Sequence, residues 1–254
     1  MLQSIMSDIG IDVTTLAFMM AAAFSTAVFH AVSGFAGALL LVIILAPVVG
    51  IKTAVPIVAV AVIISSVTRL WVFRHDLDIP IFISLILTAL PGMVIGALLF
   101  VYLPVDMIAL LLGGFLAVSV PGRRLLKNKG VKIGRFGFFA IGPVYGVISG
   151  ATMGAGLLLA PFFLGAGLSG PRIVAMTAAL GVTLNITKTI VFGASPLLTL
   201  PLFAAGLVMG LCTIPGAYAG RWVLRKTPIR IHTLLTEMVI LVGAFFFISR
   251  AIFT

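Results

Sequence analysis

The stretch Pro91-Gly92-Met93-Val94-Ile95-Gly96 is repeated later in the chain as Pro215-Gly216-Ala217-Tyr218-Ala219-Gly220. Each copy is followed at the same spacing by another proline, Pro104 in the first case and Pro228 in the second. Both copies lie inside long apolar stretches. An internal repeat in an apolar chain, interrupted at matching places, is the pattern that points to a membrane transporter and to its binding site.

The composition places the chain in a membrane. Its 254 residues are 62% hydrophobic and only 9% charged, whereas a soluble domain carries about 25% charged residues. We therefore expect a multi-pass protein of a prokaryotic cell membrane, with lipid as its main solvent and a single transmembrane domain over residues 1–254. The lone Cys212 excludes an intramolecular disulfide.

Prolines, glycines and charges divide the chain into five apolar segments per half. We expect a first repeat at about 13–121, a basic linker at 122–135 and a second repeat at about 136–252. The expected segments are 13–31, 34–49, 53–73, 79–101 and 104–121, then 136–148, 150–167, 171–193, 197–220 and 229–251. The last three of each half approach the roughly 20 residues that span a bilayer. The second of each half is short and opens with glycines, so it is either a thin crossing or a half-helix.

Lysine and arginine predict the orientation. Six basic residues lie in the linker 122–135 and four more in 221–230, so both regions are expected in the cytoplasm. The loop 100–104, which matches 221–228 in the repeat, has no basic residue and is expected outside. Equivalent loops on opposite sides predict an all-α membrane protein built of two inverted repeats, with short or broken Gly-rich helices in each half. Lys52 and Arg250 fall outside as exceptions, and no nucleic-acid partner is expected.

The glycine-rich openings are candidate binding elements. Glycine lets the backbone approach a ligand, and a helix that begins inside the membrane directs free N–H groups and a positive dipole end toward an anion. The alternative is close packing of helices through small residues. The candidates are Ser33, Gly34 and Gly37 in the first half, and Ser149, Gly150, Thr152, Gly154 and Gly156 in the second. A bulky residue at Gly154 is expected to close the site.

Charges within spans supply further candidates. Arg69 and Lys188 occupy equivalent repeat positions. Ser66 and Asn185 stand three residues earlier, one turn away on the same helix face. His30, just before Ser33, is a possible donor to an anion. The alternative for the two cations is snorkelling to the lipid headgroups.

Glu237 is the single acidic residue well inside an expected span. A buried carboxylate is costly unless it is paired or protonated, so Glu237 is a candidate for proton coupling, with a structural ion pair as the alternative. Protons or sodium are the expected coupling ions. The sequence has no metal-ligand cluster and no nucleotide loop, so no metal, cofactor or enzymatic activity is expected. Gly146-Val147-Ile148-Ser149-Gly150 has one residue too many for the Gly-x-Ser-Gly of intramembrane serine proteases.

The glycine-rich stretches carry a family resemblance. They read Gly34-Phe35-Ala36-Gly37-Ala38-Leu39-Leu40-Leu41-Val42 and Ser149-Gly150-Ala151-Thr152-Met153-Gly154-Ala155-Gly156-Leu157-Leu158-Leu159-Ala160-Pro161. With the two Pro-Gly-x-x-x-Gly segments they resemble the TauE/SafE sulfite exporter family over nearly the whole chain. Ile43 departs from the family where the first copy usually carries the proline seen as Pro161, and Ala38 departs where glycine is usual. The resemblance implies a bacterial permease for sulfite, sulfonates or related organic anions.

These observations predict a secondary transporter of a small anion that works by alternating access around a midplane site. The residues themselves argue only for a small anion, and the substrate class comes from the resemblance. The alternatives are a channel-like anion pore, an intramembrane hydrolase and a structural subunit of a larger complex. The expected partners are the anion and the lipid bilayer, with an oligomer as an open alternative.

Overall fold

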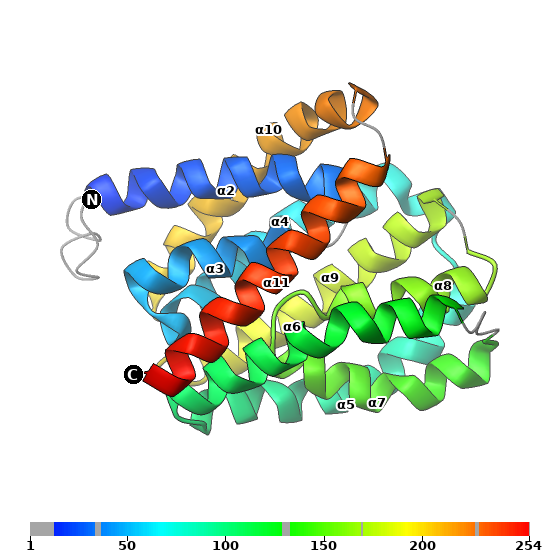
Figure 1. Ribbon diagram of the computed structural model, residues 1–254, viewed down its shortest axis with the longest axis horizontal. Helices are drawn as coiled ribbons and strands as arrows, with labels where there is room; N and C mark the ends of the chain where they lie inside the picture. Colours follow the sequence, from blue (N-terminus) through cyan, green and yellow to red (C-terminus); the bar gives the residue numbers. More distant parts are fainter. Residues whose placement is uncertain (1–12, 34–36, 129–132, 169, 227–228, 254) are drawn as a thin grey trace.

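The computed structural model describes residues 13–33, 37–128, 133–168, 170–226 and 229–253, and every regular element within them is helical (Figure 1). This confirms the all-α fold class. The helices of the first half are α2 (Val13–Ser33), α3 (Gly37–Val49), α4 (Ile51–Phe73), the 3₁₀ turn η1 (Arg74–Asp76), α5 (Ile79–Tyr102) and α6 (Val105–Asn128). Those of the second half are α7 (Arg135–Ala151), the 3₁₀ turn η2 (Ala155–Leu158), α8 (Ala160–Gly165), α9 (Gly170–Gly193), α10 (Leu200–Lys226) and α11 (Ile229–Phe253).

Most helices begin and end near the expected segment bounds, but two of them run further. We expected segments to end at 121 and 220, yet α6 continues to Asn128 and α10 to Lys226. The basic residues after these points are good helix formers. The fall in hydropathy after residues 121 and 220 therefore marks where each helix leaves the apolar layer, and not where the helix ends.

The short segment expected at 150–167 is not one helix, and this is a correction. Helix α7 continues to Ala151, and the chain then breaks at residues 152–154. Gly154 has a left-handed backbone with φ of 85°, which glycine adopts without a steric penalty. A 3₁₀ turn and the six-residue α8 follow. The corresponding segment of the first half contains α3, a single helix of 13 residues.

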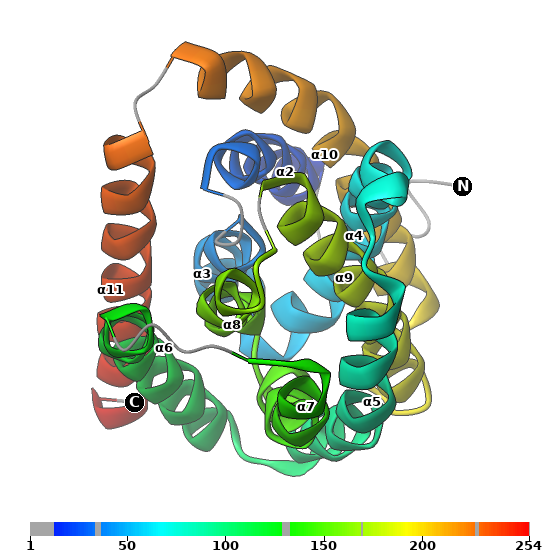
Figure 2. The same cartoon turned by 90° about the vertical axis from the view of Figure 1, so that its right-hand side faces the viewer.

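The helices pack in pairs that agree with the proposed repeat, which would map α5 and α7 onto α10 and α2. Helix α5 packs along α7, and its repeat counterpart α10 packs along α2. Helix α4 packs on α9, and α6 packs on α11. Figure 2 shows α5 beside α7 and α10 beside α2, with α3, α8 and α9 between these two pairs. The inversion of the two halves across the membrane remains a prediction.

The repeated Pro-Gly-x-x-x-Gly motif lies at these helix contacts. A Cβ on Gly92 would overlap the carbonyl oxygen of Pro143 on α7, and one on Gly96 would overlap that of Val147. On α10, a Cβ on Gly216 would lie 2.6 Å from the carbonyl oxygen of Phe24 on α2. Small residues four apart allow helix backbones to approach closely, so helix packing accounts for both glycines of the first copy and for Gly216 of the second.

The outer surface is apolar, as lipid contact requires. Of the helices in the described ranges, five are long and apolar enough to cross a membrane, at Val13–His30, Ile51–Asp76, Ile79–Tyr102, Gly170–Gly193 and Leu200–Gly220. Three shorter apolar helices lie at Gly37–Val49, Val105–Ser119 and Ile240–Ile252. Large apolar side chains face outward, such as Leu87 at 60% and Leu211 at 59% exposure. The chain is therefore a multi-pass membrane protein.

The two basic exceptions to the predicted orientation have structural partners. Lys52 donates from Nζ to the carbonyl oxygen of Val101 at 3.2 Å, in the last turn of α5. Arg250 donates from Nη1 to the carbonyl oxygen of Ala46 at 3.4 Å, in the last turn of α3. Cations are favourable at helix C-termini, where carbonyls lack intrahelical partners. A hydrogen bond to the last turn of a neighbouring helix thus accounts for the basic side chain at each of these two positions.

Candidate functional site

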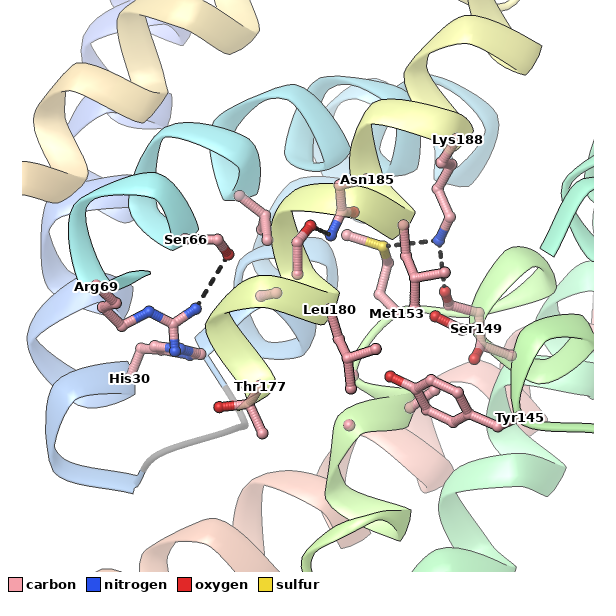
Figure 3. Close-up of a pocket in the computed structure, with 18 residues that line it drawn as sticks. His30, Ser66, Arg69, Tyr145, Ser149, Met153, Thr177, Leu180, Asn185 and Lys188 are labelled. Atoms are coloured by element: carbon pink, nitrogen blue, oxygen red, sulfur yellow. Dashed lines mark hydrogen bonds between the residues drawn. The ribbon is translucent and has the colours of Figure 1, made fainter. Parts of the chain in front are cut away.

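The broken segments meet around a cavity of about 90 Å³ in the middle of the helices (Figure 3). Its walls come from the end of α2, the start of α3, α4, the end of α7 with the break after it, and α9. Leu39 near the start of α3 lies 3.2 Å from where a Cβ on Gly154 would stand, so α3 contacts the break that follows α7. The polar lining residues are His30, Ser66, Arg69, Tyr145, Ser149, Thr152, Thr177, Asn185 and Lys188.

Lys188 on α9 is the most deeply buried charged residue of the described chain, with 1% of its surface exposed. Its Nζ donates to the carbonyl oxygen of Thr152 at 2.8 Å and lies 3.3 Å from Sδ of Met153. Its side chain crosses to the break after α7 (Figure 3), so its charge cannot reach the headgroups. The snorkelling alternative therefore does not describe Lys188.

Arg69 on α4 lies on the other side of the cavity (Figure 3). Its Nη2 donates to Oγ of Ser66 at 3.2 Å, and its Nε donates to the carbonyl oxygen of Ser65 at 3.4 Å. A guanidinium has five N–H groups, more than these two bonds use. Arg69 is therefore held by its own helix with donor capacity left for a ligand.

His30 stands beside Arg69 at the end of α2. Its Nδ1 accepts a hydrogen bond from the backbone N–H of Gly37 at 3.1 Å, which ties α2 to the start of α3. Its Nε2 is buried without a hydrogen-bond partner in the described part of the chain. Because Nδ1 is an acceptor, the proton of the neutral ring lies on Nε2. A buried donor of this kind calls for a water or ligand oxygen.

Helices α4 and α9 meet closely between the two cations. A Cβ on Gly181 would stand 2.5 Å from Oγ of Ser66, so a larger residue there would displace the Ser66 hydroxyl. Asn185, one turn after Gly181, donates from Nδ2 to the carbonyl oxygen of Gly181 at 2.8 Å. Its amide oxygen and second N–H are left for other partners. The expected pairs, Ser66 with Arg69 and Asn185 with Lys188, thus border one cavity from facing helices.

The glycine-rich opening of the second half contributes differently from our expectation. Gly154 and Gly156 line the cavity, but Gly150 belongs to α7, where a Cβ would overlap the carbonyl oxygen of Met93 on α5. Thr152 uses its hydroxyl to donate to the carbonyl oxygen of Ile148 at 2.6 Å. A long helix does not begin at this break. Side-chain cations, more than a helix N-terminus, supply the positive charge on this side.

Three expected residues of the described chain do not line this cavity, namely Gly37, Gly150 and Glu237. Gly37 lines a smaller adjacent pocket of about 30 Å³, which shares His30 and Arg69 with the main cavity. Ser33 ends α2, but its side chain lies outside the described part of the chain, as does Gly34. Glu237 is half-buried on α11 and lines neither pocket.

Sequence reasoning missed Tyr145 and Thr177, both of which line the cavity. Tyr145 stands one turn before Ser149 on α7. Thr177 stands one turn before Gly181, so Thr177, Gly181 and Asn185 form a stripe of small and polar residues on α9. That spacing of four is visible in the sequence and is a signal that could have found Thr177.

The lining chemistry suits an anion. Arg69 and Lys188 are cations, His30 offers an unpaired donor, and no aspartate or glutamate lines either pocket among the described residues. His30 is not placed as a base for Ser149, since its Nδ1 accepts from Gly37 and its Nε2 has no partner in the described ranges. In the described part of the chain, Ser149 and His30 therefore do not form the hydrogen-bonded nucleophile and base of a serine hydrolase.

The fold and cavity together define a multi-pass membrane protein with a basic internal site. The model of the family described as Sulfite exporter TauE/SafE matches residues 19–246. The chain belongs to this family, which is one of membrane transporters and not an enzyme family. No curated protein and no solved structure shows a significant match to the chain.

Proposed function

We propose that this protein is a secondary transporter of a small anion in the plasma membrane of a prokaryote. The family name points to sulfite. Sulfonates carry a similar charged sulfur–oxygen group, and related organic anions share the negative charge. The observation that carries the proposal is the cavity itself, which joins Arg69, Lys188 and the free donor of His30 and has no carboxylate among its described lining residues.

The position of the cavity supports alternating access. It lies where α7 ends, beside the end of α2 and the start of α3, next to the α4–α9 contact. Non-helical backbone inside a membrane is tolerated where protein or a water-filled cavity covers it. Broken helices from two repeats around a central site are typical of transporters whose halves rock about the substrate. We propose that the two halves move in this way around the bound anion.

Counterflow tests the proposal. Purified protein is placed in liposomes loaded with unlabelled sulfite under argon, and uptake of trace ³⁵S-sulfite is followed without an ion gradient. A transporter gives a transient accumulation of label above equilibrium, because exchange requires the carrier to return with substrate bound. A channel gives simple equilibration without overshoot, and a structural subunit or an enzyme gives the rate of empty liposomes. Either of the last two results contradicts the proposal.

Proton coupling through Glu237 remains part of the proposal. Glu237 lies on α11, which packs mainly on α6 and has no described residue in the cavity lining, so its protonation would act through movement of this helix pair. We expect Glu237→Gln to lose accumulation driven by a proton gradient and to retain sulfite counterflow at the wild-type rate. Unchanged accumulation, with an unchanged pH profile, would assign Glu237 a structural role.

A further inference from the structure

The cavity carries more positive charge than one negative charge can balance. Arg69 and Lys188 both line it, and Figure 3 shows their charged groups on opposite sides, with Asn185 and Leu180 between them. The acidic residues of the described chain lie elsewhere. Asp76 and Asp78 flank the start of α5, Asp106 is in the first turn of α6, and Glu237 is on α11.

Among the described residues, the hydrogen-bond partners of the two cations are all neutral. Lys188 contacts a carbonyl oxygen and a thioether sulfur, and Arg69 contacts a hydroxyl and a carbonyl oxygen. The other polar groups that line the cavity include Tyr145 and Ser149 on α7, His30 on α2 and Thr177 on α9, and none of these is a carboxylate. Burying an ion without an opposite charge is costly even after relaxation. A negatively charged ligand would supply the missing charge.

We infer that the species held in this cavity is a compact dianion. One negative charge would neutralise Arg69 or Lys188 and leave the other uncompensated, whereas two negative charges neutralise both. The cavity of about 90 Å³ has room for several water molecules, and therefore for a small inorganic oxyanion. This inference rests on the proposed function, and it narrows the charge of the substrate.

Sulfate and methanesulfonate separate the charge requirement from size. The two ions have similar tetrahedral shapes, but a methyl group replaces one charged oxygen in methanesulfonate, which is a monoanion. Titration calorimetry on the purified full-length protein, at constant pH and ionic strength, gives the affinity for each. We expect sulfate to bind at least about tenfold more tightly, since a hydrogen bond to a charged group contributes about 1.5–3 kcal/mol.

Three variants test whether the two cavity cations cause the preference for sulfate over methanesulfonate. Lys188→Gln and Arg69→Gln each remove one cavity cation, so each should reduce the preference for sulfate over methanesulfonate to about threefold or less. Lys52→Gln is the matched control, because Lys52 also donates to a backbone carbonyl but lines neither pocket. It should keep the wild-type preference. Size-exclusion chromatography shows whether each variant is folded. If Lys188→Gln does not fold, Arg69→Gln alone tests the charge requirement.

The outcomes distinguish this inference from the function on which it rests. Equal affinities for the two ions in the wild-type protein, or tighter binding of methanesulfonate, would overturn the dianion and leave anion transport standing. The dianion is overturned as well if Lys52→Gln removes the preference and both cavity variants keep it. Absence of binding by either ion, together with absence of sulfite counterflow, would overturn the proposed function and this inference with it.

Discussion

At the scale of single residues, Gly154 shows why a glycine in this chain cannot be judged from its neighbours in sequence. Its φ of 85° lies in the left-handed region, and Leu39 of α3 stands next to it. The sequence suggests Gly154→Leu as a probe that closes the site and leaves the fold intact. The backbone angle makes that probe unsuitable, since any side chain here adds strain as well as bulk.

We expect Gly154→Ala to destabilise the protein by about 1–2 kcal/mol, the cost of a left-handed backbone for a residue with a Cβ. The thermal unfolding midpoint in detergent should fall accordingly. Gly193→Ala is the control, because Gly193 ends α9 with no atom within 4 Å of its added Cβ and without a positive φ. Equal midpoints for the two variants would show that the bend at Gly154 does not need glycine.

At the scale of elements, α5 and α7 form a contact between backbones. Glycines of the two helices alternate along it, with Gly92 and Gly96 on α5 facing α7, and Gly146 on α7 facing the carbonyl oxygen of Ala89. Thr88 adds a hydrogen bond from Oγ1 to the carbonyl oxygen of Phe139 at 2.9 Å. This contact holds α7, and with it Tyr145 and Ser149, at the cavity wall.

Gly96→Ala should separate α5 from α7, because its Cβ would overlap the carbonyl oxygen of Val147 and a backbone atom cannot rotate away. Overpacking of this kind costs about 1–3 kcal/mol. We expect a lower unfolding midpoint and a weaker affinity for sulfite. Gly114→Ala on α6 has open space around its Cβ and should be neutral or slightly stabilising. A Gly96→Ala protein as stable as Gly114→Ala would contradict the close backbone contact.

At the scale of the whole molecule, the two halves contribute one cation each to one cavity. Arg69 comes from α4 and Lys188 from α9, the pair of helices that the repeat relates to each other. If the halves are inverted, α4 and α9 cross the membrane in opposite directions, and each brings its cation to the cavity between them.

The orientation of the loops tests the inversion. The end of α6 at Asn128 is expected in the cytoplasm, and the turn between α5 and α6, next to the well-exposed Tyr102, is expected outside. In a Cys212→Ala background, Tyr102→Cys should react with an impermeant thiol reagent on intact cells. Asn128→Cys should react only after the cells are permeabilised. The reverse pattern would place the linker outside and remove the basis for the inverted arrangement.

The sequence by itself determined the membrane class, the places of most helices and the family, because these depend on hydropathy, helix punctuation and motifs along the chain. It also selected Ser66, Arg69, Asn185 and Lys188 as a group, since spacing along a helix defines a common face. Only the tertiary structure decided which glycines pack helices together and which one bends the chain. Gly150 packs on α5, while Gly154, four residues later, bends the chain beside the cavity. A glycine's role depends on which backbone approaches it, and that neighbour comes from a distant part of the chain.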